Sequence, residues 1–193
     1  MEIIKYPPPT LRYRSKPLKR IDSALRETVA EMFQLMYEAQ GIGLAANQVN
    51  LPYRLFVLNV HEERSKDYEM VFINPVISRP RDPDQKEEGC LSLPGVYAQV
   101  RRPASIHVTA LNLAGEPIDA EFDGLLARAI QHETDHLDGI LFIDRLVDLT
   151  KKQLQDDLDR FQKKYDLNRS ESTIPSDEII FKRLAEMEAT YCV

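Results

Sequence analysis

The stretch Gly124–Leu137, GLLARAIQHETDHL, decides how the rest of the chain is interpreted. It is rich in good helix formers and Gly139 follows as a stop signal, so it predicts a helix over residues 124–137. His132 and His136 are four residues apart and therefore lie about one turn from each other on one face of that helix. Two imidazoles at this spacing, with Glu133 beside the first, are typical of metal sites that activate water for hydrolysis.

A metal held by two histidines needs a third protein ligand if its fourth position is to hold water. The extended motif HExxHxxGxxH does not supply one, because Phe142 stands where the last histidine belongs. A thermolysin-like glutamate is also missing nearby, since the next glutamate is Glu171. The remaining histidines, His61 and His107, fall in a charged loop and in a strand-like run, which favours surface or structural roles.

Cys90 is the remaining candidate, within the run EEGCLSLPG at residues 87–95. An isolated internal cysteine is more often a small buried hydrophobe than a ligand. Here two glycines and a proline shape the backbone closely around the thiol, and glycine is otherwise scarce in this chain. We therefore predict that Cys90, His132 and His136 bind one divalent cation and leave its fourth position to water.

A further glycine-rich run, GIGLAANQV, covers Gly41–Val49. Its first residues match the start of a dinucleotide-binding fingerprint, but that fingerprint requires a strand before it and a helix after it. Residues 22–40 instead show the apolar stripe of an amphipathic helix. Gly41 is then expected to cap that helix at its C-terminus, which leaves Gly43 and Gln48 without an explanation.

These three runs together resemble peptide deformylase. The motifs are GxGxAAxQ at Gly41–Gln48, EGCLS at Glu88–Ser92 and HExDH at His132–His136, in this order and at about this spacing. The similarity extends from about Ile4 to Arg145. GxGxAA alone is weak, HExxH alone is moderate and EGCLS alone is fairly strong, but their joint occurrence is highly specific.

The resemblance implies a cofactor bound by the same residues that the spacing predicts. Cys90, His132 and His136 would hold one divalent metal ion, which in this family is Fe2+ in cells, although zinc, nickel or cobalt can occupy the site. Ligand softness fits zinc and iron alike, so the residue types do not choose between them.

The resemblance also implies a reaction. A metal-bound water would attack the formyl group on the N-terminal methionine of a newly synthesised polypeptide, and formate would be released. Glu133 would act first as general base and then as general acid. The side-chain amide of Gln48 and the backbone N–H of Leu91 would stabilise the negative charge that develops on the formyl oxygen.

The substrate is expected to bind along the backbone of two motifs. An extended peptide would lie as a strand beside Gly41–Leu44 and beside Gly89–Leu91, held mainly by main-chain hydrogen bonds. Leu125 and Ala129 share a helix face with the histidines and, with Ile42, are candidates for the methionine pocket, although core packing is an equally simple interpretation. The expected substrate-binding residues are Ile42, Gly43, Gly89, Leu125 and Ala129.

Charged residues beside the motifs suggest a supporting ion pair. Asp135 lies next to a predicted ligand but projects away from it on the helix. By the resemblance, this carboxylate or Glu88 pairs with an arginine on the strand after EGCLS, here Arg102. A solvated surface charge is the simpler alternative for Asp135.

Composition limits the class of protein. The chain has 193 residues and a net charge of −6 without a long basic run, which argues against broad nucleic-acid binding through phosphates. No apolar stretch approaches membrane-spanning length, and the first residues lack the basic start of a secretory signal. The two cysteines, Cys90 and Cys192, indicate a reducing compartment, so we expect a cytoplasmic location, although an organellar form without its transit peptide would look the same.

Strand-like and helical runs are segregated along the chain rather than alternating. Strands are expected over residues 54–60, 70–77, 97–101, 105–111 and 118–122, and helices over residues 22–40, 124–137 and after 150. This pattern predicts an α+β fold with mainly antiparallel sheet around a central HExxH metal-binding helix, followed by C-terminal helices.

Residues 1–150 are expected to form the catalytic domain, called the catalytic body below, and residues 151–193 a helical extension, called the C-terminal tail. The tail shows helical spacing over residues 151–165 and 176–189. We expect it to pack on the body or on a partner subunit, in a monomer or a homodimer. Docking to the ribosome near its exit tunnel is an alternative, although the tail is not distinctly basic.

Two other classes of protein fit part of the pattern. A zinc protease would need a third ligand close to the histidine motif, and a noncatalytic structural metal site would not require Glu133 or Gln48. A deformylase that acts on N-formylmethionyl nascent peptides accounts for all three motifs.

Overall fold

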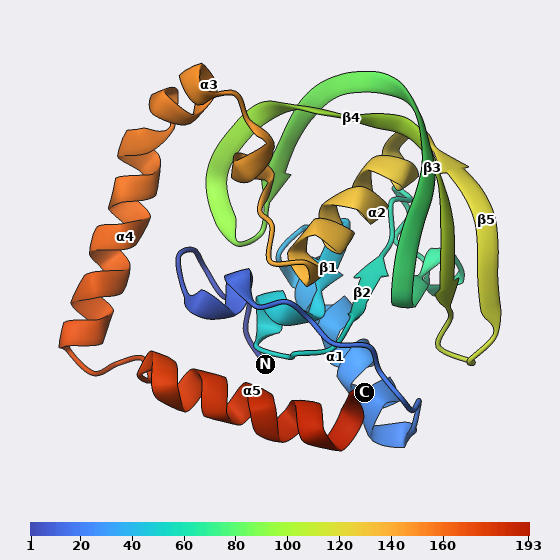
Figure 1. Ribbon diagram of the computed structural model, residues 1–193, viewed down its shortest axis with the longest axis horizontal. Coiled ribbons are helices and arrows are strands. Elements are labelled where there is room, and N and C mark those ends of the chain that lie inside the picture. Colours follow the sequence, from blue (N-terminus) through green and yellow to red (C-terminus); the bar gives the residue numbers. More distant parts are fainter.

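A five-stranded antiparallel sheet forms the centre of the computed structural model, which describes residues 1–193 (Figure 1). The strands follow chain order across the sheet, from β1 at one edge to β5 at the other. Their bounds are β1 Gly43–Ala45, β2 Leu55–Leu58, β3 Met70–Cys90, β4 Leu93–Leu111 and β5 Pro117–Asp123. The mixed helix and strand class and the antiparallel sheet are as predicted.

The helices precede and follow this sheet. Their bounds are α1 Ser23–Glu38, α2 Gly124–Leu137, α3 Asp148–Gln153, α4 Gln155–Ser170 and α5 Asp177–Tyr191. The side chain of Asp22 starts α1 by accepting a hydrogen bond from the Leu25 N–H at 3.0 Å. Apolar side chains at the predicted helical spacing bury one face of α1 against the first strands.

The prediction that Gly41 caps α1 is wrong. Gln40 takes the left-handed conformation after the helix, with φ of 57°, and the Gly41 N–H closes the turn on the Met36 carbonyl at 2.8 Å. Gly41 is in close contact with another motif, because a Cβ at this position would lie 2.6 Å from Leu91 Cδ1. The glycine therefore permits two distant motifs to approach each other.

Helix α2 has the predicted bounds and lies beneath the arch formed by β3 and β4 (Figure 1). Ala127, Ile130 and Leu137 pack into a buried cluster with Phe56 and Phe72 of the sheet. This packing fixes the rotation of α2 about its axis. The face that carries the paired histidines is consequently turned away from that cluster.

Strands β3 and β4 are much longer than the predicted segments, which treated residues 97–101 and 105–111 as separate strands and ended the preceding strand at 77. Pro80 and Pro83 and a run of charges made a strand over residues 78–90 look unfavourable. The second half of β3 is paired only with β4. The prolines, which have no N–H donor, can therefore be accommodated where the strand has no second partner. Register shifts near Asn74 and Arg79, both with positive φ, absorb the irregularities.

The C-terminal tail runs along the outside of the molecule (Figure 1). No residue of α4 is buried, but Leu158 and Phe161 pack partly against an apolar cluster of the catalytic body. Leu184 of α5 is buried, and Cys192 after it pairs with Leu18 in an isolated antiparallel bridge. None of the helices combines the length and the hydropathy that crossing a membrane requires.

Candidate metal centre

Three side chains that could hold a cation converge from two elements. Cys90 ends β3, and His132 and His136 lie one turn apart on α2. Their sulfur and nitrogen atoms all lie within 4.8 Å of one another, and Cys90 Sγ is 3.2 Å from His136 Nε2. The structure thus brings together the three residues that the sequence predicts as ligands.

The thiol of Cys90 accepts hydrogen bonds from two sides. The Ser92 N–H lies 3.4 Å from Sγ, and the Gln48 side-chain amide lies 3.5 Å from it. A register shift between Gly89 and Cys90 turns the strand at this point, so that the side chain faces α2. The thiolate is the form of cysteine that binds metals.

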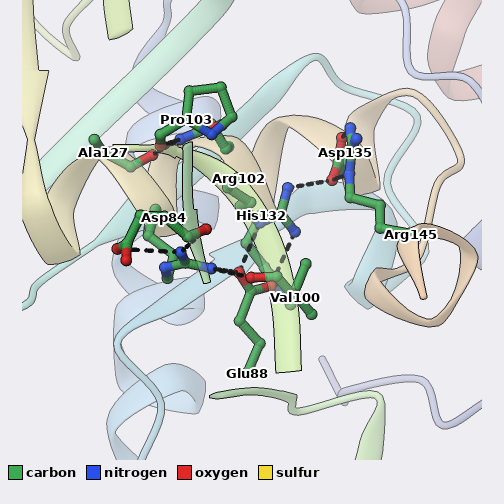
Figure 2. A network of polar contacts seen from close by, with 11 residues as sticks. Asp84, Glu88, Val100, Arg102, Pro103, Ala127, His132, Asp135 and Arg145 are labelled. Carbon is green, nitrogen blue, oxygen red and sulfur yellow. Dashed lines mark hydrogen bonds and ion pairs between the residues drawn. The ribbon is translucent and has the colours of Figure 1, made fainter. Parts of the chain in front are cut away.

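His132 is anchored by a buried carboxylate. Its Nδ1 lies 3.1 Å from Glu88 Oε2 (Figure 2). Glu88 also accepts from Arg102 Nε at 2.7 Å and from an Arg128 nitrogen at 2.6 Å. Burial opposes ionisation of Glu88, but the hydrogen bonds from His132 and Arg102 outweigh it and lower its pKa to about 2. An ionised Glu88 holds the proton on Nδ1, so Nε2 is the atom of His132 that would bind a cation after losing its own proton.

The polar network continues behind α2 (Figure 2). Arg102 also donates to Asp135 Oδ2 at 2.7 Å, and Arg145 pairs with the same carboxylate. Arg128 reaches the Val100 carbonyl at 3.0 Å. The expected contacts of Arg102 are therefore present, and Arg102 pairs with both candidate carboxylates rather than with one.

Arg128 and Arg145 were not predicted to belong to this network. Arg128 lies one turn before His132, so its position on the motif face of α2 was a usable signal. Arg145 comes from the 3-10 helix Phe142–Arg145, and nothing in its local sequence indicated that it folds back onto Asp135.

His136 has a different environment. Its Nδ1 is buried without a hydrogen-bond partner, while its backbone carbonyl accepts a hydrogen bond from the Asn47 side chain. Burial lowers the pKa of His136, and charge on His132 lowers it further. The imidazole is therefore neutral near pH 7, as a metal ligand must be.

Glu133 projects toward β1. A Cβ on Gly43 would lie 2.4 Å from Glu133 Oε1, so only glycine fits at position 43 while this carboxylate keeps its place. This contact explains Gly43, for which the predicted helix cap at Gly41 gave no reason. Glu133 Oε2 is buried and has no hydrogen-bond partner, and burial raises the pKa of Glu133 to about 7. A bound cation nearby would lower that pKa.

The side-chain amide of Gln48 has a fixed orientation. Its Oε1 accepts from the Ala45 N–H at 2.8 Å, which directs the amide nitrogen to the opposite side. That nitrogen donates to Ser92 Oγ at 3.0 Å and lies beside Cys90 Sγ. Gln48 therefore presents a donor to the three candidate ligands.

A cavity of about 600 Å3 opens onto this cluster. All predicted site residues except His136 line it, and His136 lies behind them. Ile42 and Leu125 expose apolar side chains to the cavity, whereas Ala129 is 5% exposed. Lys5 and Arg128 also line the cavity and were not predicted. The lining residues from the prediction are Ile42, Gly43, Gln48, Gly89, Cys90, Leu91, Leu125, Ala129, His132 and Glu133.

Two strand edges border the cavity. β1 is the terminal strand of the sheet, so its outer edge has no strand partner. The last residues of β3, Glu87–Gly89, are paired with β4 on one side only. Backbone donors and acceptors along a strand edge can bind an extended peptide as an added strand.

The donor set fits a metal centre. A thiolate with two imidazoles suits zinc or ferrous iron, and three protein ligands leave a position for a water. Glu133 lines the same cavity, and its buried Oε2 has no hydrogen-bond partner. No donor in the set favours calcium or magnesium, which prefer oxygen ligands.

Comparison with known proteins identifies the family to which the chain belongs. Residues 1–152 match the family model described as polypeptide deformylase. Peptide deformylase from Rhodopirellula baltica is 42% identical over 191 residues, which cover 99% of this chain and 95% of that protein.

Solved structures give the same result. Crystals of peptide deformylase from Plasmodium falciparum provide a match with a TM-score of 0.83 and 38% identity, over 86% of this chain and 98% of that chain. The structure of a peptide deformylase from Synechococcus elongatus in complex with actinonin has a TM-score of 0.78 and 43% identity, over 83% of this chain and 86% of that chain.

Proposed function

Because the chain belongs to the peptide deformylase family, we propose that it removes the N-formyl group from the N-terminal methionine of nascent polypeptides at the cluster of Cys90, His132 and His136. The observation that carries this proposal is the convergence of those three side chains in a cavity that also holds the unpaired carboxylate oxygen of Glu133. Enzymes of this family are metal-dependent.

Cys90, His132 and His136 would hold a single divalent ion, Fe2+ in cells, with zinc, nickel or cobalt as substitutes in vitro. Once bound, the ion would supply a water of lowered pKa and a Lewis acid for the formyl oxygen. The anchoring of His132 by Glu88 supports this assignment, because metal-binding imidazoles are commonly oriented through their second nitrogen.

Glu133 acts as the proton carrier in this proposal. Its Oε2 accepts a proton from the attacking water and then donates it to the nitrogen of the departing amine, so that formate and a free N-terminus are produced. Burial of the carboxylate and the absence of a competing hydrogen-bond partner support this role. A proton-transfer group of this kind typically contributes about 10²- to 10⁴-fold to the rate.

Gln48 and Leu91 stabilise the charge on the formyl oxygen. The amide nitrogen of Gln48 is directed to the cluster by the bond between its own oxygen and the Ala45 N–H. Leu91 directly follows Cys90 and lines the cavity, so its N–H is the neighbouring backbone donor. Loss of one such donor typically costs about 10²- to 10³-fold in kcat.

The substrate would bind as an extended strand between the open edge of β1 and the end of β3, next to Gly43 and Gly89. Ile42, Leu125 and Ala129 would form apolar walls around the methionine side chain. Small or apolar residues at these positions favour an unbranched apolar side chain over a charged one.

We further propose that residues 1–150 carry the reaction and that the tail, residues 151–193, belongs to the same folded unit. Burial of Leu184 and the bridge between Leu18 and Cys192 support this division. The reaction would take place in the cytoplasm, where formylated chains leave the ribosome. Two unpaired cysteines agree with a reducing compartment.

The test is release of formate from an N-formylmethionyl tripeptide by protein that is loaded with Fe2+, Co2+ or Zn2+ or stripped by a chelator. We expect turnover with metal and none without it, and no cleavage of internal peptide bonds. Actinonin, which occurs in the Synechococcus elongatus complex, should inhibit the loaded enzyme. Metal-loaded protein that releases no formate would rule out the proposed function.

Glu133→Gln tests the proton carrier separately. It should lower kcat by about 10²- to 10⁴-fold while one metal ion per chain stays bound, because the three ligands are unchanged. Glu121→Gln is the matched control, since Glu121 is an exposed residue of β5 paired with Arg81. Residual activity of Glu133→Gln close to that of the control would contradict the role of Glu133.

A further inference from the structure

The N-terminal arm, residues 4–6, binds two of the segments that form the metal centre. The Ile4 N–H donates to the Gln48 carbonyl at 2.8 Å, and the Tyr6 N–H donates to the Ser92 carbonyl at 2.8 Å. These two backbone bonds place the arm across the segments that carry the proposed donors for the formyl oxygen. The side chain of the residue between them, Lys5, is thereby directed to the same place.

Lys5 makes a third bond, and it differs from the other two because its donor is charged. Its Nζ donates to the Leu91 carbonyl at 2.8 Å. That carbonyl belongs to the same amide group as the Ser92 N–H, which donates to Cys90 Sγ at 3.4 Å. An ammonium, an amide and the Cys90 sulfur therefore form a continuous chain of hydrogen bonds.

Such a chain transmits polarisation. A cation on the carbonyl oxygen of an amide makes the N–H of that amide a stronger donor, because hydrogen bonds in series polarise one another. Hydrogen bonds with a charged partner are also about twice as strong as neutral ones. The ammonium therefore strengthens the Ser92 bond to sulfur and restricts rotation of Leu91.

The charge of Lys5 is available for this task. Arg128 also lines the cavity with a positively charged side chain, but it forms ion pairs with Glu88 and Asp84. Lys5 makes no ion pair with a carboxylate, and its bond to Leu91 is the contact that holds it. Burial lowers the pKa of Lys5, and negative charge at Cys90 opposes that shift, which reflects their proximity.

We propose that Lys5 is a positioning residue, which tunes the thiolate of Cys90 through the Leu91–Ser92 amide and keeps the Leu91 N–H directed into the cavity. This inference rests on the proposed function, because it assumes that Cys90 binds the metal and that Leu91 stabilises the formyl oxygen. A weaker bond to sulfur makes the thiolate a stronger electron donor. The bound cation then becomes a weaker Lewis acid, so turnover slows.

Lys5→Met removes the ammonium and keeps a side chain of similar length, and Lys5→Arg restores the charge. Lys19→Met is the matched control, because Lys19 also donates from Nζ to a backbone carbonyl, that of Ala189 at 3.2 Å, but far from the cavity. Each protein is loaded with Co2+ for the absorption band of sulfur-to-cobalt charge transfer. Turnover of an N-formylmethionyl peptide is measured on the same preparations.

For Lys5→Met we expect a charge-transfer band at longer wavelength and kcat lowered by roughly tenfold, with KM within about twofold of wild type. Lys5→Arg should restore most of the wild-type band position and kcat. Lys19→Met should change neither of them. An unshifted band in Lys5→Met would overturn the proposal. So would an increase in KM alone, since that result would make Lys5 a substrate contact.

The outcomes also separate this inference from the function on which it rests. Wild-type protein that shows no sulfur-to-cobalt band or releases no formate contradicts the metal centre itself. Wild-type protein that shows both, together with a Lys5→Met variant identical to it, contradicts only the role of Lys5.

Discussion

The catalytic body and the C-terminal tail are stabilised in different ways. The body buries several ionised side chains behind its metal-binding helix, including Glu88, Arg102 and Asp135, and each of them has a charged partner. In the tail, α4 buries no residue at all, and α5 buries Leu184 alone. The body therefore depends on buried charged partners, whereas the tail is attached by a few apolar side chains and by hydrogen bonds near its C-terminus.

This difference has a consequence for mutations. A buried charge that loses its partner is costly, and here the affected groups also orient a metal ligand, so stability and activity should fall together. No residue of the tail lines the cavity. Changes there should alter stability and leave turnover per folded molecule unchanged.

The largest effect is expected for Arg102→Leu. It removes the cation shared by Glu88 and Asp135, whose side chains are 5% and 9% exposed. Breaking a buried pair in this way typically lowers the free energy of unfolding by about 3–5 kcal/mol. Urea unfolding measures that loss, and chelator competition should show weaker metal binding, because Glu88 would no longer be held against His132.

Arg81→Leu provides the comparison for Arg102→Leu. Arg81 also pairs with a carboxylate, that of Glu121, but both side chains are more than half exposed. Exposed pairs typically contribute about 0–1 kcal/mol. If the two variants lost equal stability, the buried network would not be what distinguishes the body from the tail.

A smaller effect is expected for Leu184→Ala in the tail. Leu184 is 1% exposed and borders a cavity of about 140 Å3 between α5 and the N-terminal arm. Truncation of a buried leucine typically costs about 2–5 kcal/mol, and we expect a value near the lower limit. Leu167→Ala in α4, where the leucine is 56% exposed, should change the free energy of unfolding by less than about 0.5 kcal/mol.

Both Leu184→Ala and Arg102→Leu should lower the free energy of unfolding, but only Arg102→Leu should also lower turnover. Below the unfolding temperature, kcat and KM of Leu184→Ala should equal those of wild type. A clear drop in kcat would mean that the tail acts on the metal centre, and the division between a reactive body and a supporting tail would be wrong.

The two regions also differ in how far their structure follows from the sequence. The bounds of α2 were predicted, because helical periodicity is a local signal. The convergence of Cys90 with His132 and His136 was predicted by elimination of other ligands and by the family resemblance. The contacts of Arg102 came from the family resemblance. The continuation of β3 past Ile77 was missed, since an edge strand tolerates prolines that a central strand excludes.

Other features depend on contacts between distant segments and have no local signal. Gly41 was interpreted as a helix cap, whereas its side-chain space is taken by Leu91. Lys5 is an ordinary charged residue in the sequence, and only the fold brings it to the Leu91 carbonyl. In the tail, the sequence predicted helices from their apolar spacing. It gave no sign of the break at Leu154 that separates α3 from α4.

The smallest effect concerns a hydrogen bond between two side chains, one from each region. The Tyr13 hydroxyl of the body donates to the Glu188 carboxylate of α5. Burial and this hydrogen bond raise the pKa of Tyr13 to about 12, and negative charge at Cys192 would raise it further. The folded state thus binds the phenolic proton more tightly than the unfolded state, whose tyrosine titrates near the ordinary value of 10.0.

The contribution of Tyr13 is therefore complete below pH 10 and is lost as the pH rises toward 12. We expect the bond to contribute about 1 kcal/mol. Urea unfolding of wild type and Tyr13→Phe at pH 8 and pH 11 tests this. The difference in free energy of unfolding between the two proteins should be smaller at pH 11. At that pH the wild type has begun to lose the contribution of its Tyr13 hydroxyl, which Tyr13→Phe lacks at every pH. A difference of the same size at both pH values would show that the Tyr13 hydroxyl does not help to hold the tail.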